Sequence, residues 1–373
     1  MISTNGYYQV GNKTFQCKAQ ALIEASTEGI KPQWIFNDDV FGAIDWTIPL
    51  SGSIETYYKK RCLQLRESYD YLVLNFSGGS DSTTILTTFL QNNIKLDQIS
   101  TYWPHSLWSN HFAATSNVQG AANRESEWEL TVKPVLEYVQ KFYPEIKIHF
   151  IDYSDSITTE ILEHEYQIAT HHENIGYFKR QLANYNAHKH LIDKGSTSAI
   201  ITGNDKPQLA ILPDGIYAYF LDILTSTAMV QNEKTNQQVE FFYWSRDMPE
   251  LAVKSCQELA YYVKQTPSLH RLFQLGARKT EEEKTLLDEV VRSVVYPSWK
   301  HDVFQANKPL YGIYSDADQW IHYKFKNERF YQSWESRIRS HCALIDDQYF
   351  SYINGQKDQY IGFVSPFYKI CNL

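Results

Sequence analysis

The stretch that most constrains the fold is YLVLNFSGGSDSTTILTTFL, from Tyr71 to Leu90. Its first six residues, YLVLNF, form an apolar run that is typical of a buried β-strand. Two glycines and several hydroxyl-bearing residues follow, and the segment from Ser82 to Gln91 is predicted to be helical. The stretch therefore predicts a strand, a tight glycine turn and a helix in direct succession.

The same alternation continues as far as residue 203. Further strands are predicted at Asp97 to Trp103, Ile146 to Tyr153 and Ser198 to Gly203, and helices at Glu125 to Tyr143 and Glu173 to Lys194. Such alternation predicts an α/β fold, with a mostly parallel twisted sheet and helices on both faces. In folds of this kind, ligands bind at the carboxyl ends of the strands.

The flanking segments are less regular, and we divide the chain into three parts. Residues 1–66 are an N-terminal elaboration that ends in a helix, 67–230 are the α/β domain, and 231–373 are an aromatic-rich α+β region. In the last part we predict a strand at Val239 to Trp244, helices at Pro249 to about Lys264, Thr280 to Val295 and Asp316 to about Leu344, and a hairpin around Asn354-Gly355.

Composition narrows the function classes. Hydrophobic residues make up 43% of the 373 residues and charged residues 21%, as in an ordinary globular protein. Aromatic residues reach 15%, which favours packing in which Tyr and Trp bury a ring and keep one polar handle; nucleic-acid stacking is the alternative. The net charge of -8 disfavours a large nucleic-acid footprint, while a local basic patch stays compatible with it.

The spacing of the cysteines and the hydropathy of the chain indicate the cellular compartment in which we expect the protein. The five cysteines form no CxxC pair, which argues against a zinc knuckle or a redox dithiol and favours reduced thiols. Neither a charged and then apolar leader nor a run of 18 apolar residues is found. We therefore expect a cytoplasmic protein without a membrane partner.

The glycine turn has the features of an anion site. At Gly78 and Gly79 the backbone can adopt unusual angles and a ligand can approach the main chain. The helix that follows offers unpaired N–H groups and the positive end of its dipole. A carboxylate in such a loop, Asp81, makes chemical sense if a metal ion lies between it and a phosphate. Hydroxyl donors to the anion are available at Ser77, Ser80, Ser82 and Thr83.

Two common phosphate loops are absent, since the chain contains neither GxxxxGK[ST] nor GxGxxG. The hexapeptide SGGSDS, Ser77 to Ser82, resembles instead the SGGxDS signature of the PP-loop (N-type) ATP pyrophosphatases. That superfamily includes asparagine synthetase, GMP synthetase, NAD synthetase and enzymes that modify tRNA through adenylated bases. The alternative is a Ser/Gly-rich turn with an N-capping serine.

The resemblance implies a cofactor, a metal and a reaction. Members hold the pyrophosphate of ATP in this loop with Mg²⁺, and a substrate oxygen attacks the α-phosphorus. An adenylated intermediate and pyrophosphate result, and a nucleophile then displaces AMP. By this resemblance Asp81 is a catalytic residue and metal ligand, and residues 77–83 bind ATP. The acceptor is not identified.

A second element, Thr202 to Lys206, follows the last predicted strand of the α/β domain. Many members of the superfamily carry a glycine and an acidic residue here, near the nucleotide or the metal. The resemblance implies nucleotide contacts by Gly203 and Asn204, an Mg²⁺ contact by Asp205 and a phosphate contact by Lys206. A TGND turn before the break at Pro207 is the alternative.

Departures from the family pattern leave the reaction open. Ile2 stands where an asparagine synthetase has its nucleophilic cysteine, so we expect that any nitrogen donor arrives free or from a partner protein. One alternative is an oxidoreductase similar to phosphoadenosine-phosphosulfate reductase; Cys371 lies near the end of the chain, but the ECGLH-like setting is missing. Another is a non-catalytic protein that binds nucleotide and an interaction partner.

Three segments are similar to poorly characterised PP-loop proteins of tailed bacteriophages. They are the N-terminal stretch, WSRDMPEL from Trp244 and VYPSWKHDVF from Val295. If the chain is phage-encoded, we expect it in the host cytoplasm.

Overall fold

The computed structural model describes most of the predicted α/β region and its flanks. The described residues are 6–15, 18–102, 128–152, 187, 188, 190, 191, 196–203, 206–222, 237–275, 277, 279–297, 327–329, 332, 333 and 363–373. The predicted helix at Asp316 to about Leu344 lies mostly outside them, as does most of the one at Glu173 to Lys194. The hairpin around Asn354-Gly355 lies entirely outside them.

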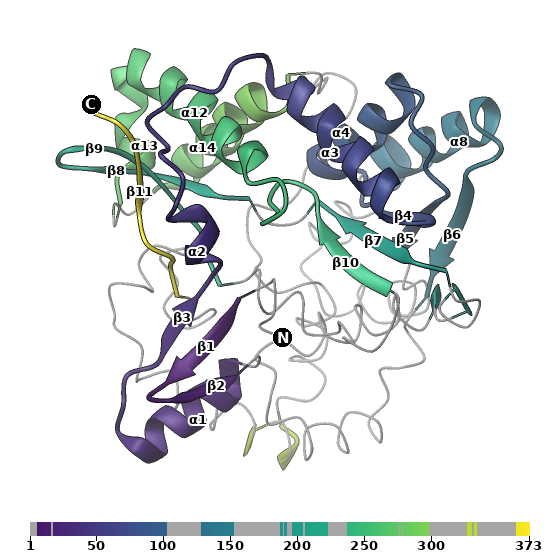
Figure 1. Ribbon diagram of the computed structural model, residues 1–373. Coiled ribbons are helices and arrows are strands. Elements are labelled where there is room, and N and C mark those ends of the chain that lie inside the picture. The colour runs from purple at the N-terminus through teal and green to yellow at the C-terminus, as the bar shows by residue number, and fades with distance from the viewer. Residues whose placement is uncertain are drawn as a thin grey trace.

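A five-stranded parallel sheet is the largest element of the described part (Figure 1). Its order is β10-β7-β4-β5-β6, and every neighbouring pair is parallel. The strands are β4 (Tyr71–Asn75), β5 (Gln98–Tyr102), β6 (Lys147–Ile151), β7 (Ser198–Thr202) and β10 (Gln237–Phe241). The predicted α/β fold is therefore confirmed, and four of these strands lie in the segments predicted for the α/β domain.

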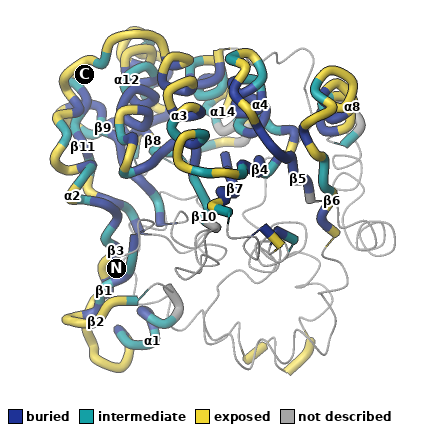
Figure 2. Tube along the Cα trace, turned by 45° about the vertical axis from the view of Figure 1, so that its right-hand side comes forward, coloured by how far each residue is buried: buried dark blue, intermediate teal, exposed yellow. Residues whose placement is uncertain are grey.

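The two central strands explain why their sequences are continuously apolar. All five residues of β7 are buried, and so are the middle three of β4. A strand buried on both faces has no polar side to offer, so it does not alternate apolar and polar residues. Figure 2 shows the consequence, because β4 and β7 run through the molecule as buried segments while the outward side of α8 is exposed.

Helices cover one face of this sheet. They are α3 (Ile54–Ser68), α4 (Ser80–Gln91) and α8 (Lys133–Phe142), which follows a π-helical turn at Trp128–Val132. Leu72, Leu74 and Ile201 pack there in one core with side chains of all three helices. On the opposite face Leu191, in a helical stretch, packs against Val73 and Ile200.

Two small antiparallel sheets accompany the parallel sheet in the described part of the chain. The N-terminal one has the order β2-β1-β3 and comprises β1 (Tyr7–Val10), β2 (Lys13–Phe15) and β3 (Gln33–Ile35), accompanied by α1 (Lys18–Glu28) and α2 (Asp38–Phe41). The other has the order β11-β9-β8 and comprises β8 (Gln208–Leu212), β9 (Gly215–Tyr219) and β11 (Tyr368–Cys371).

The C-terminal region of the chain joins these sheets. It supplies β10 to the parallel sheet, and it forms α12 (Glu250–Gln265), a 3₁₀ turn (Pro267–Leu269), α13 (His270–Phe273) and α14 (Glu281–Val295). Thr280 caps α14 through a reciprocal capping box with Glu283, as expected for a helix predicted to begin at this threonine. Helix α12 packs against α3, α14 and the β8-β9-β11 sheet, so it bridges the parts.

Many of the aromatic residues in the described part of the chain pack against one another in the hydrophobic core. One cluster stacks rings from the N-terminal sheet, α2, β11 and the segments after β9 and β10; its members include Trp34, Phe36, Phe41, Trp46, Phe220, Trp244 and Tyr368. No helix in the described residues is long and apolar enough to cross a membrane.

Candidate functional site

The glycine turn lies where the chain order across the parallel sheet reverses. From β4 the chain moves to β5 and β6 on one side, whereas β7 and β10 lie on the other side of β4. Loops that leave two such neighbouring strands diverge and open a crevice at their carboxyl ends. The turn after β4 carries Ser77 to Gly79 and leads directly into α4, and Gly203 and Lys206 follow β7, so the fold brings both predicted elements to one edge.

Gly78 is required at its position for two independent reasons. Its φ of 74° lies in the left-handed region, which side chains other than glycine rarely adopt. A Cβ there would also lie 2.6 Å from Thr131 Oγ1 and 2.8 Å from Val132 Cγ2. The turn is thus pressed against the π-helical segment that precedes α8.

Serine hydroxyls shape the turn from inside. Ser82 Oγ accepts a hydrogen bond from the Ser77 N–H at 3.2 Å and donates to the Gly79 carbonyl at 3.3 Å. Ser77 Oγ accepts from the Gly79 N–H at 3.4 Å. Two of the four predicted hydroxyl donors therefore hold the loop together in this structure.

The amino end of α4 is the anion-attracting part of the loop. The helix begins at Ser80, two residues earlier than predicted, because the extended Gly79 serves as its N-cap. Glycine offers no capping side chain, so within the described part of the chain the first-turn N–H groups of Ser80, Asp81 and Ser82 have neither a side-chain cap from Gly79 nor an intrahelical partner. They lie at the positive end of the helix dipole.

We predicted that the hydroxyl of Thr83 helps bind the anion, but in the structure the Thr83 side chain lines a pocket between α3 and α4. Its Oγ1 is buried and makes no hydrogen bond within the described part of the chain. The side chain lines a small pocket between α3 and α4 together with Glu55, Thr87 and Gln91. What Thr83 gives to the loop is its main-chain N–H, which donates to the Gly79 carbonyl at 3.0 Å.

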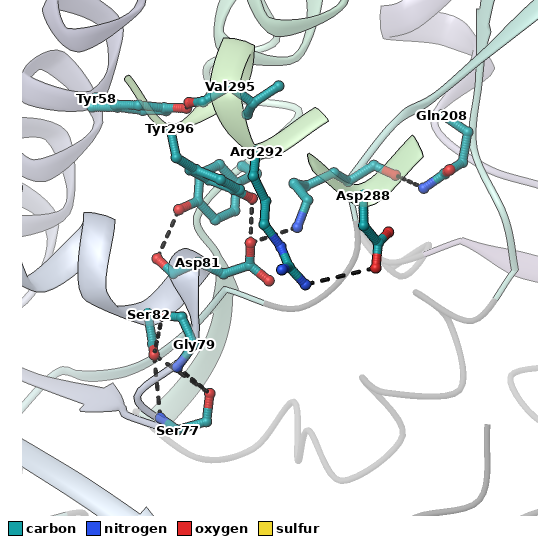
Figure 3. A network of polar contacts seen from close by, with 12 residues as sticks. Tyr58, Ser77, Gly79, Asp81, Ser82, Gln208, Asp288, Arg292, Val295 and Tyr296 are labelled. Carbon is teal, nitrogen blue, oxygen red and sulfur yellow. Dashed lines mark hydrogen bonds and ion pairs between the residues drawn. The ribbon is translucent and has the colours of Figure 1, made fainter. Parts of the chain in front are cut away.

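Asp81 is the centre of a polar network (Figure 3). Lys206 Nζ donates to Asp81 Oδ1 at 2.7 Å, and the hydroxyl of Tyr296 donates to the same oxygen. The hydroxyl of Tyr243 donates to the main-chain carbonyl of Asp81 at 2.7 Å. The structure thus brings together two predicted site residues, Asp81 and Lys206, which are 125 residues apart in the chain. Gly203 makes room for it, since a Cβ there would lie 3.0 Å from Asp81 Cβ.

Two buried tyrosine rings enclose this pair. Tyr243 and Tyr296 meet edge to face with centroids 5.6 Å apart, and Lys206 Nζ lies 5.4 and 5.3 Å from their centroids, within cation–π range. Burial, with the negative charge of Asp81 acting in the same direction, raises the pKa of the Tyr296 hydroxyl well above its ordinary value. It therefore stays protonated, and a hydrogen-bond donor, at neutral pH.

Helix α14 adds a second ion pair beside the first. Arg292 and Asp288 are 3.6 Å apart and stand one helical turn from each other. Partial desolvation raises the pKa of Asp288, although its side chain is about half exposed; the charge of Asp81 raises it further, and the cations Arg292 and Lys206 oppose the rise. The pKa of Asp288 therefore depends on the charges of both Asp81 and Lys206.

Sequence reasoning missed Tyr243, Tyr296, Asp288 and Arg292. Tyr296 opens the YPSW run of the VYPSWKHDVF segment and Tyr243 directly precedes WSRDMPEL, two segments that we quoted only for their resemblance to phage proteins. The one local signal was the tyrosine between a predicted helix end and Pro297. It does not specify a partner, because Asp81 is 215 residues away.

The donor set fits a metal that is held jointly with a nucleotide. Asn204 and Asp205 lie outside the described residues. Among the residues that are described, no group of three or more His, Cys, Asp and Glu could hold a metal ion by itself. Mg²⁺ is usually bound through one or two carboxylates, with phosphate oxygens and water as the remaining ligands. Asp81 suits that role, since its Oδ2 makes no hydrogen bond within the described part.

Cys371, the residue on which the reductase alternative depends, lies in another sheet. It belongs to β11, which pairs with β9. Burial raises the pKa of its thiol, whereas a nucleophilic cysteine has a lowered pKa.

Compared with models of known protein families and with curated proteins, the chain matches none.

Proposed function

We propose that the chain binds ATP with Mg²⁺ through its glycine turn and transfers the adenylyl group to an acceptor, as PP-loop ATP pyrophosphatases do. The observation that carries the proposal is the convergence at one sheet edge of the strained Gly78, the uncapped amino end of α4 and the Asp81–Lys206 pair. A structural serine–glycine turn needs neither the lysine from the neighbouring loop nor an uncapped helix end.

The residues have distinct tasks in this proposal. The first-turn N–H groups of α4 bind the pyrophosphate portion of ATP, and Lys206 contributes a positive charge to it. An acceptor oxygen attacks the α-phosphorus, the bond to the bridging oxygen of the β-phosphate breaks, and pyrophosphate leaves with that electron pair. The N–H groups and Lys206 stabilise the negative charge that develops on the leaving group.

Asp81 would hold the magnesium ion through Oδ2. When bound, the ion would neutralise phosphate charge and orient the leaving group. A nucleophile, such as ammonia from solution or from a partner protein, then attacks the activated carbon of the adenylated acceptor. The bond from that carbon to the adenylate oxygen breaks, and AMP leaves with the electron pair.

The test is product release by purified protein. With ATP, Mg²⁺, an ammonium salt and a panel of small-molecule and nucleobase acceptors, we expect pyrophosphate and AMP in equal amounts. Asp81→Ala should abolish the release. Glu145→Ala, which removes an exposed carboxylate between α8 and β6, should leave it unchanged. Failure of the wild-type protein to release either product, or equal release by Asp81→Ala, would contradict the proposal.

A second candidate is a nucleotide-binding protein without chemistry. The observation in its favour is that Lys206 already neutralises Asp81, so a metal ion is not needed to balance the charge. Calorimetry separates the two candidates, because tight ATP binding without products would support this one. The reductase alternative predicts that Cys371→Ser abolishes turnover with a thiol donor; the raised pKa of the thiol does not favour it.

A further inference from the structure

We propose that Tyr296 is a positioning residue for the carboxylate of Asp81: its hydroxyl holds Oδ1, so that Oδ2 is presented to the metal ion that accompanies ATP. The inference rests on the proposed function, because it assumes that Asp81 meets a nucleotide-bound metal. It adds to that function a residue from the far end of the chain.

The ring of Tyr296 is fixed from several sides. The side chain is buried, it meets Tyr243 edge to face, and the preceding residue, Val295, accepts a hydrogen bond from the hydroxyl of Tyr58 through its carbonyl. These contacts anchor the end of α14 to α3 and to the segment after β10. The hydroxyl therefore reaches Asp81 from a rigid support, as an outer-shell partner must if it is to orient a metal ligand.

Tyr296 and Lys206 share one oxygen but differ in what they can do. Lys206 carries a full charge on a flexible side chain that is about one fifth exposed, so it can move from Asp81 to a phosphate. Tyr296 is neutral and cannot move without opening the aromatic packing. It orients the carboxylate without neutralising it, and the negative charge stays available to a metal ion after the lysine has moved.

Tyr243 provides a matched comparison inside the same cluster. It is also buried and also donates to Asp81, but its hydroxyl bonds the main-chain carbonyl and not the carboxylate. Removing either hydroxyl takes one hydrogen bond from Asp81 and one polar atom from the cluster. Once Lys206 has moved from Asp81 to a phosphate, only the loss at Tyr296 leaves the carboxylate free to rotate.

The experiment measures ATP affinity by calorimetry, once with Mg²⁺ and once with a chelator, for the wild-type protein, Tyr296→Phe and Tyr243→Phe. In Tyr296→Phe we expect the affinity with Mg²⁺ to fall by about tenfold or more, the usual effect of losing an outer-shell partner. Its metal-free affinity should stay within about twofold of wild type. In Tyr243→Phe both affinities should change by the same factor. Tyr296→His, which keeps a ring donor, is the second variant and should recover part of the Mg²⁺ dependence.

Each other outcome overturns the inference. Equal weakening with and without Mg²⁺ in Tyr296→Phe would mean that the tyrosine has a structural role only, and unchanged affinities would mean that the carboxylate needs no support. ATP binding by the wild-type protein that does not respond to Mg²⁺ would remove the metal role and leave nucleotide binding intact. No ATP binding by the wild-type protein at all would refute the proposed function itself, and this inference with it.

Discussion

Gly78→Ala combines two separable energetic penalties, a left-handed backbone conformation and a steric clash. Gly29 isolates the first of them and Gly203 isolates the second. At Gly78 the new methyl group meets both a left-handed φ of 74° and two side-chain atoms closer than 3.0 Å. Gly29 has a similar φ of 66°, but nothing lies within 4 Å of a Cβ placed there. Gly203 does not have a positive φ, and its Cβ would lie 3.0 Å from Asp81 Cβ.

These geometries set the expected magnitudes. A left-handed conformation costs an L-residue about 1–2 kcal/mol, so Gly29→Ala should lower the free energy of unfolding by about that amount. Overpacking by one methyl group costs about 1–3 kcal/mol, and Gly203→Ala should fall at the lower end, near about 1 kcal/mol, because 3.0 Å is the milder clash. Gly78→Ala should combine both penalties and lose about 2–5 kcal/mol.

Urea unfolding followed by tryptophan fluorescence measures all three variants on the same scale. The ATP affinity of Gly78→Ala should also fall, since Thr131 and Val132 can be cleared only if the turn moves off the π-helical segment. Gly29→Ala should keep wild-type affinity. If Gly78→Ala proves no less stable than Gly29→Ala, then Thr131 and Val132 yield without cost, and the argument that close packing constrains this loop is wrong.

Three further substitutions test charges in and around the sheet. Lys206→Met should change the free energy of unfolding by less than about 1 kcal/mol, because its ion pair is partly exposed, yet calorimetry should show an ATP affinity lower by about tenfold. Arg61→Ala should cost about 3 kcal/mol in urea unfolding, because the buried arginine is paired with Glu240 and its loss detaches α3 from β10; a loss below about 1 kcal/mol would contradict this. Burial alone would raise the pKa of Asp97. Hydrogen bonds from Lys95, the Leu72 amide and Arg66 outweigh burial, so the pKa lies below its ordinary value of about 3.9. Because the pKa is lower in the folded state, the ionised carboxylate stabilises the protein above about pH 4, and this stability is lost as the pH falls through the folded pKa. The free energy of unfolding of Asp97→Asn should therefore be lower than that of the wild type at pH 6 and approach it at pH 3. A gap that stays constant between these two pH values would show that Asp97 contributes no pH dependence.

The central strands and the turn between β4 and α4 could be predicted because their signals are local. The apolar run at Tyr71 to Phe76 and the glycines after it specify a buried strand and a turn without reference to any other segment. The start of α4 was predicted at Ser82, but the extended Gly79 is the N-cap and the helix begins at Ser80.

The other elements were missed for two reasons: one local signal was not used, and the remaining contacts depend on distant partners. The β8-β9 hairpin turns at Pro213-Asp214 within LPDG, a turn signal that was present in the sequence and that we did not use. Strand β10 was predicted as a strand, but its place beside β7 follows from pairing, which no local pattern encodes. The contacts of Tyr243 and Tyr296 with Asp81 cross 162 and 215 residues, respectively, and depend on packing in the completed core.

The pairing of β4 with β7 bears on the order in which the parts of the site form during synthesis and folding. Their pairing joins segments about 127 residues apart, so the loop-closure entropy must be overcome before any of the strand contacts form. A chain emerging from the ribosome contains the complete glycine turn long before it contains Lys206, and Tyr296 emerges later still. During synthesis the turn can exist without its lysine and its tyrosine, and the site cannot be complete before Tyr296 has been synthesised. A nucleotide that binds as proposed would act on the completed fold and slow its unfolding, without guiding its formation.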